Sequence, residues 1–171
     1  MSTNPVRLRR AIPAARGNAR QRGDPAAPGF RIEDSPFFQM NRTAGAYAIA
    51  MEQALRAVDT DIPRWRVLML AHERGPISVG QIAENAVLKL STATKVVQRL
   101  RDEGLVILSR GRDDGRVTNV KTTAAGDAAV AIIRQVASSL YRRAFRDIDS
   151  NDIQQLIRIL ARVERNLRSS A

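Results

Sequence analysis

Residues 78–123 decide the fold: SVGQIAENAVLKLSTATKVVQRLRDEGLVILSRGRDDGRVTNVKTT. This stretch predicts two short helices, followed by two strands that an arginine-bearing turn connects. Ser78 and Gln81 form a capping box, in which each side chain satisfies a backbone N–H of the other, so a helix begins there. Gly104 predicts the end of the second helix, because helices commonly end at a residue with positive φ. Two helices followed by a hairpin are the layout of a winged helix.

The second predicted helix, about residues 91–102, has one apolar side and one polar side. Apolar residues at helical spacing predict the side that packs inward: Ala93, Val96, Val97 and Leu100. Hydroxyl, amide and cationic groups lie opposite: Ser91, Thr94, Lys95 and Gln98, with Thr92 and Arg99 beside them. Such groups reach base edges and phosphates when a helix enters the major groove of double-stranded DNA. An ordinary solvated face is the alternative.

The hairpin after this helix presents cations at its tip. Residues 105–108 predict one strand, and the alternation over residues 117–122 predicts the returning strand. The turn-rich tip carries three arginines: Arg110, Arg112 and Arg116. An arginine side chain is thin enough to enter a minor groove, whose negative potential favours a guanidinium. We expect Asp114 to pair with Arg116 or a neighbour and to hold the guanidinium in place.

The chain resembles the MarR (multiple-antibiotic-resistance regulator) family of bacterial and archaeal transcription factors over residues 37–167. The resemblance is carried by IPRWRVLMLAHERGPISVGQIAENA at residues 62–86 and by LSTATKVVQRLRDEGLV at residues 90–106. The wing is similar to the family's D-x-R-x-x-x-V-x-L-T, through Asp114, Gly115, Arg116, Val120, Thr122 and Thr123. The chain departs from the family at Thr122, where Leu is usual, and near Lys89, where a capping Asp, Asn or Ser is common.

The resemblance implies a mainly α fold with a small β-hairpin wing, in which dimerisation helices flank a winged helix-turn-helix domain. It also implies roles for individual residues. Major-groove contacts would come from the polar helix face: Ser91, Thr92, Thr94, Lys95, Gln98 and Arg99. Arg116 would enter the minor groove with Asp114 as its orienting partner, and Arg110 and Arg112 belong to the same wing.

The chain is expected to divide into an arginine-rich arm, residues 1–33, and a MarR-type domain, residues 34–168. Within the domain, residues 34–60 and 123–168 would form dimerisation helices around the winged module at residues 61–122. The expected dimer interface is Phe37, Met40, Leu156, Leu160, Val163 and Leu167. A symmetric dimer matches two half-sites of a palindromic operator, about 34 Å apart. The alternative is that these helices complete a monomeric core.

The formal net charge of +11 over 171 residues favours polyanionic partners. Residues 1–31 hold seven arginines against Asp24 alone, whereas residues 89–121 hold eight cations against four acids. The first stretch lacks apolar periodicity, so we expect a disordered arm that contacts phosphates without sequence preference. A mitochondrial transit peptide is the alternative, which Asp24 and the prolines support less well.

Several function classes find little support. The chain has no cysteine, which excludes thiol nucleophiles, disulfides, zinc fingers and cysteine-based redox sensing. A single histidine, His72, is more often structural than a metal ligand or general base, and Asp113 with Asp114 more often pairs with nearby arginines. We therefore expect no enzyme, cofactor or metal. No apolar run approaches the ~18 residues of a membrane span, so a cytoplasmic protein without a membrane partner is expected.

The family resemblance implies a small effector, bound where the dimerisation helices meet the winged module. Its expected lining is Tyr47, Trp65, Met69 and His72, although all four could equally be core residues. An aromatic or anionic molecule, such as an aromatic acid or its coenzyme A thioester, is the expected class. The leading hypothesis is a homodimeric, sequence-specific repressor of adjacent genes, which an effector releases from its operator. The alternative is a basic architectural protein that coats DNA without sequence preference.

Overall fold

The computed structural model describes residues 22–111 and 117–169, and it divides the chain into two compact units, Met1–Tyr47 and Ala48–Ala171. In the first unit, residues 22–31 form turns, and a short 3-10 helix, η1 (Ile32–Asp34), precedes α2 (Pro36–Arg56). Residues 1–21 of the expected disordered arm lie outside the described residues.

Helix α2 begins where the sequence predicts. The Ser35 hydroxyl accepts a hydrogen bond from the Phe38 N–H at 3.4 Å, and Pro36 occupies the first helical position. The later part of α2 belongs to the second unit, where Met51 and Leu55 are fully buried. Phe37, from the expected dimer interface, is 53% exposed, and Met40 is half-buried.

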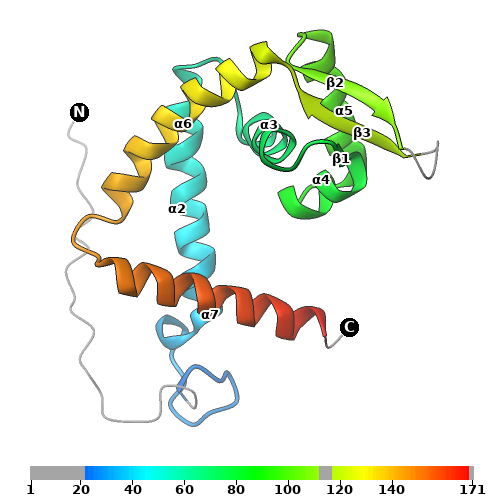
Figure 1. Cartoon of the computed structure of the whole chain (residues 1–171). Coiled ribbons are helices and arrows are strands. Elements are labelled where there is room, and N and C mark those ends of the chain that lie inside the picture. Colours follow the sequence, from blue (N-terminus) through cyan, green and yellow to red (C-terminus); the bar gives the residue numbers. More distant parts are fainter. Residues whose placement is uncertain (1–21, 112–116, 170–171) are drawn as a thin grey trace, which may run out of the picture. The chain divides into compact units, whose positions relative to one another are not determined.

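The second unit contains the winged module and two long helices (Figure 1). Its elements in order are α3 (Ile62–Arg74), β1 (Ile77–Ser78), α4 (Val79–Ala86), α5 (Leu90–Asp102), β2 (Val106–Arg110), β3 (Thr118–Thr122), α6 (Ala124–Ala144) and α7 (Ser150–Arg168). The capping box of Ser78 and Gln81 is present at the start of α4. Asp61 caps α3 by accepting from the Arg64 N–H at 2.8 Å, which explains the helix start at this point.

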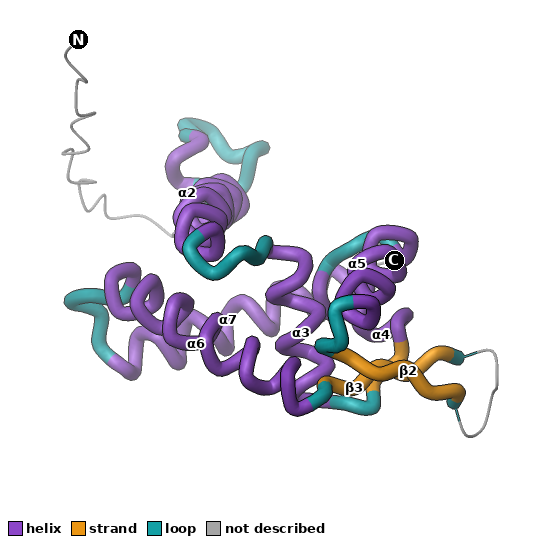
Figure 2. The backbone as a smooth tube through the Cα atoms, turned by 90° about the horizontal axis from the view of Figure 1, so that it is seen from above, coloured by secondary structure: helices purple, strands orange, loops and turns teal. Residues whose placement is uncertain are grey.

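The three strands form an antiparallel sheet in the order β1-β3-β2. Figure 2 shows β2 and β3 running side by side, away from the helices of the module. Their register pairs Leu108 with Val120, and Ile77 of β1 pairs with Val120 from the other side. The sequence predicts the hairpin but misses β1, because a strand of two residues is too short to show alternation.

The core of the second unit lies where α3, α4 and α5 pack with the sheet and with α6. Its fully buried side chains include Leu68, Ile82, Val97, Leu100, Val106, Val120 and Val130. The predicted inward stripe of α5 is confirmed, since Ala93, Val97 and Leu100 are buried and Val96 packs against the same core. Burying the stripe leaves the opposite side of α5 at the surface.

Thr123 joins the sheet to α6. Its hydroxyl accepts from the Gly126 N–H at 3.1 Å and donates to the Gly104 carbonyl oxygen at 2.7 Å. Thr123 is therefore the N-cap of α6. Because Gly104 has a φ of +73°, the end of α5 turns back toward this cap, as the sequence predicts for a helix-terminating glycine.

Helix α7 has no buried residue in the single chain. Its apolar stripe includes Leu156, Leu160 and Leu167, which are 44%, 39% and 58% exposed. Val163 on the same helix is half-buried. An amphipathic helix with its apolar side in water is a surface that usually meets another molecule. Within the described residues, no helix combines the length and apolar composition that crossing a bilayer requires.

Gly126 supports a testable prediction about this packing. A Cβ atom at Gly126 would collide with the Leu105 carbonyl oxygen and would lie 3.3 Å from the Thr122 Cβ. We expect Gly126→Ala to lower the free energy of unfolding by about 1–3 kcal/mol, because the start of α6 must move away from β2. Urea unfolding at one fixed protein concentration measures the change.

Gly45→Ala is the matched control, because a Cβ atom at Gly45 in α2 meets nothing within 4 Å. Replacing a helical glycine with alanine there should stabilise the chain by up to about 1 kcal/mol. A Gly126→Ala variant as stable as the unchanged chain would contradict the packing described.

Candidate nucleic-acid interface

Helix α5 is the expected reading helix, and it begins at Leu90, one residue earlier than the sequence predicts. Lys89 is its N-cap, with extended backbone and no side-chain capping bond. The Lys89 carbonyl oxygen nevertheless accepts from the N–H groups of Thr92 and Ala93, at 2.9 and 3.0 Å. The first turn therefore closes through the backbone alone, which leaves its foremost N–H groups available to an anion such as a phosphate.

The structure places the predicted polar residues of α5 on or beside its accessible face. Ser91, Thr94, Lys95 and Arg99 are exposed, whereas Thr92 and Gln98 are half-buried. The Thr94 hydroxyl donates to the Leu90 carbonyl oxygen at 2.8 Å. Its proton is therefore used inside the helix, and Thr94 offers a partner only oxygen lone pairs and a methyl group.

The wing lies beside this face. A hollow of about 340 Å³ lies between α5 and β3. Its lining comes from β1, α4, α5 and the start of β3: Ser78, Val79, Gly80, Leu90, Thr94, Val97, Gln98, Val117 and Thr118. Arg110, the last residue of β2, is exposed and pairs with Thr118. Arg112, Asp114 and Arg116 lie outside the described residues, so their roles at the tip of the wing stay predictions.

An ion pair holds the C-terminal end of α5 against α3. Arg64 Nη1 donates to Glu103 Oε1 at 2.9 Å, and the second guanidinium nitrogen donates to the other carboxylate oxygen. The Arg64 side chain is 15% exposed and that of Glu103 is 36% exposed. Arg99 also approaches Glu103, at 3.8 Å. A bidentate pair of this kind fixes both distance and orientation, so it positions the reading helix.

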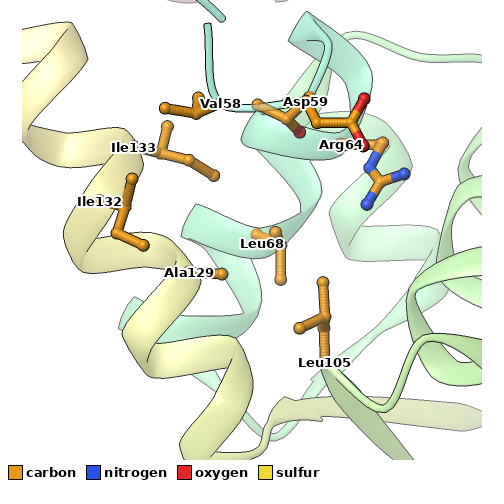
Figure 3. A pocket seen from close by; sticks show the side chains of 9 residues that line it. Val58, Asp59, Arg64, Leu68, Leu105, Ala129, Ile132 and Ile133 are labelled. Atoms are coloured by element: carbon orange, nitrogen blue, oxygen red, sulfur yellow. The ribbon is translucent and has the colours of Figure 1, made fainter.

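Arg64 also borders a cavity of about 130 Å³ between α3 and α6 (Figure 3). Its lining is mostly apolar: Val58, Asp59, Thr60, Arg64, Leu68, Leu105, Ala129, Ile132 and Ile133. Two polar atoms of this lining, Arg64 Nε and Thr60 Oγ1, are buried and have no hydrogen-bond partner within the described residues. Because these two atoms are covered, the accessible lining of the cavity is mainly apolar, with the residues Asp59, Thr60 and Arg64 along its border.

The cavity is not lined by the residues that the sequence suggests for an effector. Trp65 and Met69 are half-buried and pack against the core, which is the alternative that the sequence left open for them. Tyr47 belongs to the first unit and is 42% exposed. Sequence reasoning missed Arg64 and the α6 residues, because their meeting depends on packing between distant segments.

His72 takes part in a hydrogen-bonded cluster that joins α3, β3 and α6. Asp127 Oδ1 accepts from the Thr122 hydroxyl at 2.6 Å and lies 2.8 Å from His72 Nδ1. The hydrogen bond from Thr122, and then that from His72, lower the pKa of Asp127 below its ordinary value. Thr122, which departs from the usual leucine, is 8% exposed, so Asp127 satisfies an otherwise buried hydroxyl.

Comparison with known proteins agrees with this geometry. The model of the MarR family matches residues 61–118, which hold α3, β1, α4, α5 and β2. The HTH-type transcriptional repressor IacR of Pseudomonas putida is 40% identical over 157 residues, which cover 92% of this chain and 93% of that protein. The chain belongs to the MarR family. It is a DNA-binding transcriptional regulator of the MarR type, as the resemblance of its helices and wing implied.

Two solved structures share the fold of this chain. A MarR family regulator from Silicibacter pomeroyi DSS superposes with a TM-score of 0.74 at 25% identity, over 82% of this chain and 94% of the other. CouR from Rhodococcus jostii RHA1, solved with p-coumaroyl-CoA, gives 0.71 at 21% identity, over 78% and 94%. The predicted winged helix fold is confirmed. The family and its members are transcriptional regulators and not enzymes, in agreement with the sequence-based prediction.

The ion pair of Arg64 and Glu103 generates a prediction for this MarR protein. Glu103→Gln should lower the free energy of unfolding by about 1–2 kcal/mol, because a largely buried guanidinium loses its charged partner. The partial exposure of Glu103 keeps the loss below that of a fully buried pair. Urea unfolding gives the stability, and titration with duplex DNA should show weaker binding by the variant.

Asp102→Asn is the matched control, because Asp102 is the preceding residue and pairs with its neighbour Arg101 at the surface. That change should alter stability by no more than about 0.5 kcal/mol. Equal stability of the two variants would show that Glu103 does not hold α5 in place.

Proposed function

We propose that this MarR protein is a homodimeric repressor that binds a palindromic operator through α5 and the wing. The observation that carries the proposal is the exposed polar and cationic face of α5 beside a basic hairpin. Ser91, Lys95 and Arg99 are exposed on that face, opposite the buried stripe. A helix presented in this way can enter a major groove, while the arginines of the wing reach the adjacent minor groove.

The proposed dimer rests on the exposed apolar side of α7. Leu156, Leu160 and Leu167 would pack against a second copy, together with Phe37 and Met40 of α2. A two-fold axis places two identical α5 helices on one side of a duplex, and half-sites then lie about one helical turn apart. Sedimentation of the full chain at micromolar concentration should give a dimer.

Selection of duplexes from a random pool tests the proposal directly. The selected operator should bind about 10³-fold more tightly than random duplex at physiological salt, whereas a protein that coats DNA would give a ratio near one. Gln98→Ala should relax the base preference, and Arg116→Ala should weaken operator binding by about 1–3 kcal/mol.

Arg143→Ala is the control for lost charge, since Arg143 is an exposed cation near the far end of α6. It should leave the operator preference unchanged. A base preference that survives Gln98→Ala in full, with operator affinity unaffected by Arg116→Ala, would reject the assigned contacts.

We further propose that a small anionic effector, an aromatic acid or its coenzyme A thioester, releases the repressor. The cavity between α3 and α6 would hold its apolar part, since an apolar cavity of about 150 Å³ is known to bind benzene. A carboxylate or carbonyl oxygen would approach the guanidinium of Arg64, which borders the cavity. CouR, with its bound p-coumaroyl-CoA, supports this ligand class for a protein of the same fold.

The proposed release depends on the position of Arg64. An anion that binds its guanidinium competes with Glu103 for the same group, and α5 then loses its attachment to α3. A dimer binds both half-sites strongly only while its two reading helices keep the spacing of the groove. A shift of a few ångströms at either helix would therefore release the operator.

Ala129→Leu should make release harder, because the larger side chain fills part of the cavity without changing its charge. Benzoate, phenylacetate and benzoyl-coenzyme A are suitable probes, titrated into the operator complex and followed by fluorescence anisotropy. Whichever probe releases the unchanged protein should be needed at about tenfold higher concentration, equivalent to about 1.4 kcal/mol.

Ala128→Leu is the matched control, because Ala128 is the preceding residue of α6 and faces solvent. It should respond like the unchanged protein. Equal release of both variants would place the effector elsewhere, and operator affinity without a probe checks that both variants keep their fold.

A further inference from the structure

An apolar side chain interrupts the polar surface of α5 at its first residue. Leu90 is 59% exposed, although it opens the helix that otherwise presents hydroxyls, an amide and cations. A lone exposed leucine is common on protein surfaces and needs no explanation by itself. The position of Leu90 within α5 indicates that this leucine has a role.

Leu90 lies on the same ridge of α5 as two predicted base-reading residues. Thr94 follows it by four residues and Gln98 by eight, so the three side chains stand one above another along the helix. All three line the hollow between α5 and β3. Leu90 is therefore part of the surface that would face the major groove.

A hydrogen bond made by the Thr94 hydroxyl extends the apolar surface of Leu90 by one helical turn. Its hydroxyl proton is held by the Leu90 carbonyl oxygen at 2.8 Å. Thr94 cannot donate that proton to a base, so its methyl group becomes its main contribution to contact with a base edge. Leu90 and Thr94 together form a short apolar step, with the exposed Lys89 before it and the exposed Lys95 after it.

The turn before α5 determines where the helix begins. Val87 has φ +54° and ψ +51°, a left-handed conformation that is strained for a β-branched residue. Val87 is 84% exposed, and its conformation closes the end of α4, where its N–H donates to the carbonyl oxygens of Ala83 and Glu84. The turn keeps Val87 clear of the core and starts α5 at Leu90.

We propose that Leu90, with the methyl group of Thr94, contacts the C5-methyl group of one thymine in each operator half-site. In the major groove, thymine is distinguished from the other bases by that methyl group, which apolar side chains recognise. The adjacent lysines suit the flanking phosphates. The inference rests on the proposed function of α5 as the reading helix, and it adds thymine as the base that this ridge selects.

Deoxyuridine replacement tests the contact, since it removes the methyl group and leaves the hydrogen-bonding edge of the base intact. The full chain is titrated against the selected operator and against operators in which one thymine per half-site is replaced symmetrically. Replacement at one thymine position should weaken binding by the unchanged protein about fourfold per half-site, which is the effect of burying one methyl-sized group. For a dimer that contacts both half-sites, the expected loss of affinity is roughly fifteenfold.

Leu90→Ala should bind the thymine operator more weakly, and it should lose clearly less than about fourfold per half-site when that same thymine is replaced, because only the Thr94 methyl group still contacts it. Ile107→Ala is the matched control, because Ile107 is 56% exposed on β2 and is absent from the reading helix. It should keep the full sensitivity to deoxyuridine. Both exposed substitutions should leave the urea midpoint nearly unchanged, so folding does not obscure the comparison.

The possible results separate this inference from the proposed function. Clearly reduced sensitivity at one thymine in Leu90→Ala alone supports the contact. An operator whose every thymine can be replaced without loss, or losses that add fully in Leu90→Ala, would overturn the contact while operator binding stands. A selection that yields no preferred sequence would overturn both the contact and the operator.

Discussion

The burial of one stripe of α5 is the constraint on which the rest of the structure depends. Ala93, Val97 and Leu100 are buried against the winged module, which fixes the rotation of the helix about its own axis. Because this stripe is buried, the opposite, polar side of α5 faces outward. Arg64 then fixes the C-terminal end of α5 through Glu103, so both rotation and tilt of the reading helix are determined by contacts with α3 and the core.

Much of the fold could be predicted because its signals are local. The capping box at Ser78, the cap at Asp61, the turn at Gly104 and the cap at Thr123 each lie within a few residues of the element they begin or end. The 3.6-residue period of α5 also predicts correctly which side is buried. The sequence predicts the start of α5 one residue too late, because Lys89 is the N-cap and makes no side-chain capping bond that would mark it.

The features that the sequence could not predict depend on contacts between distant segments. Arg64 and Glu103 are 39 residues apart, and His72 and Asp127 are 55 residues apart. No periodicity or motif marks such pairs. Thr122 departs from the family pattern, and only the structure shows that its hydroxyl donates to Asp127. The cavity beside Arg64 likewise forms only where α3 and α6 pack. Local patterns therefore predict which side of α5 is exposed better than they predict which residues line the cavity.

The junction at Thr123 has a consequence for how this protein can vary. A single residue, Thr123, separates the last residue of β3 from the first residue of α6. Its hydroxyl donates to the Gly104 carbonyl oxygen and accepts from the Gly126 N–H. One inserted residue would rotate α6 by about 100° and redirect its buried side chains away from α3. The number of residues between β3 and α6 is therefore more strictly limited than the type of residue found there. Insertions are better accommodated in the exposed connection between α6 and α7.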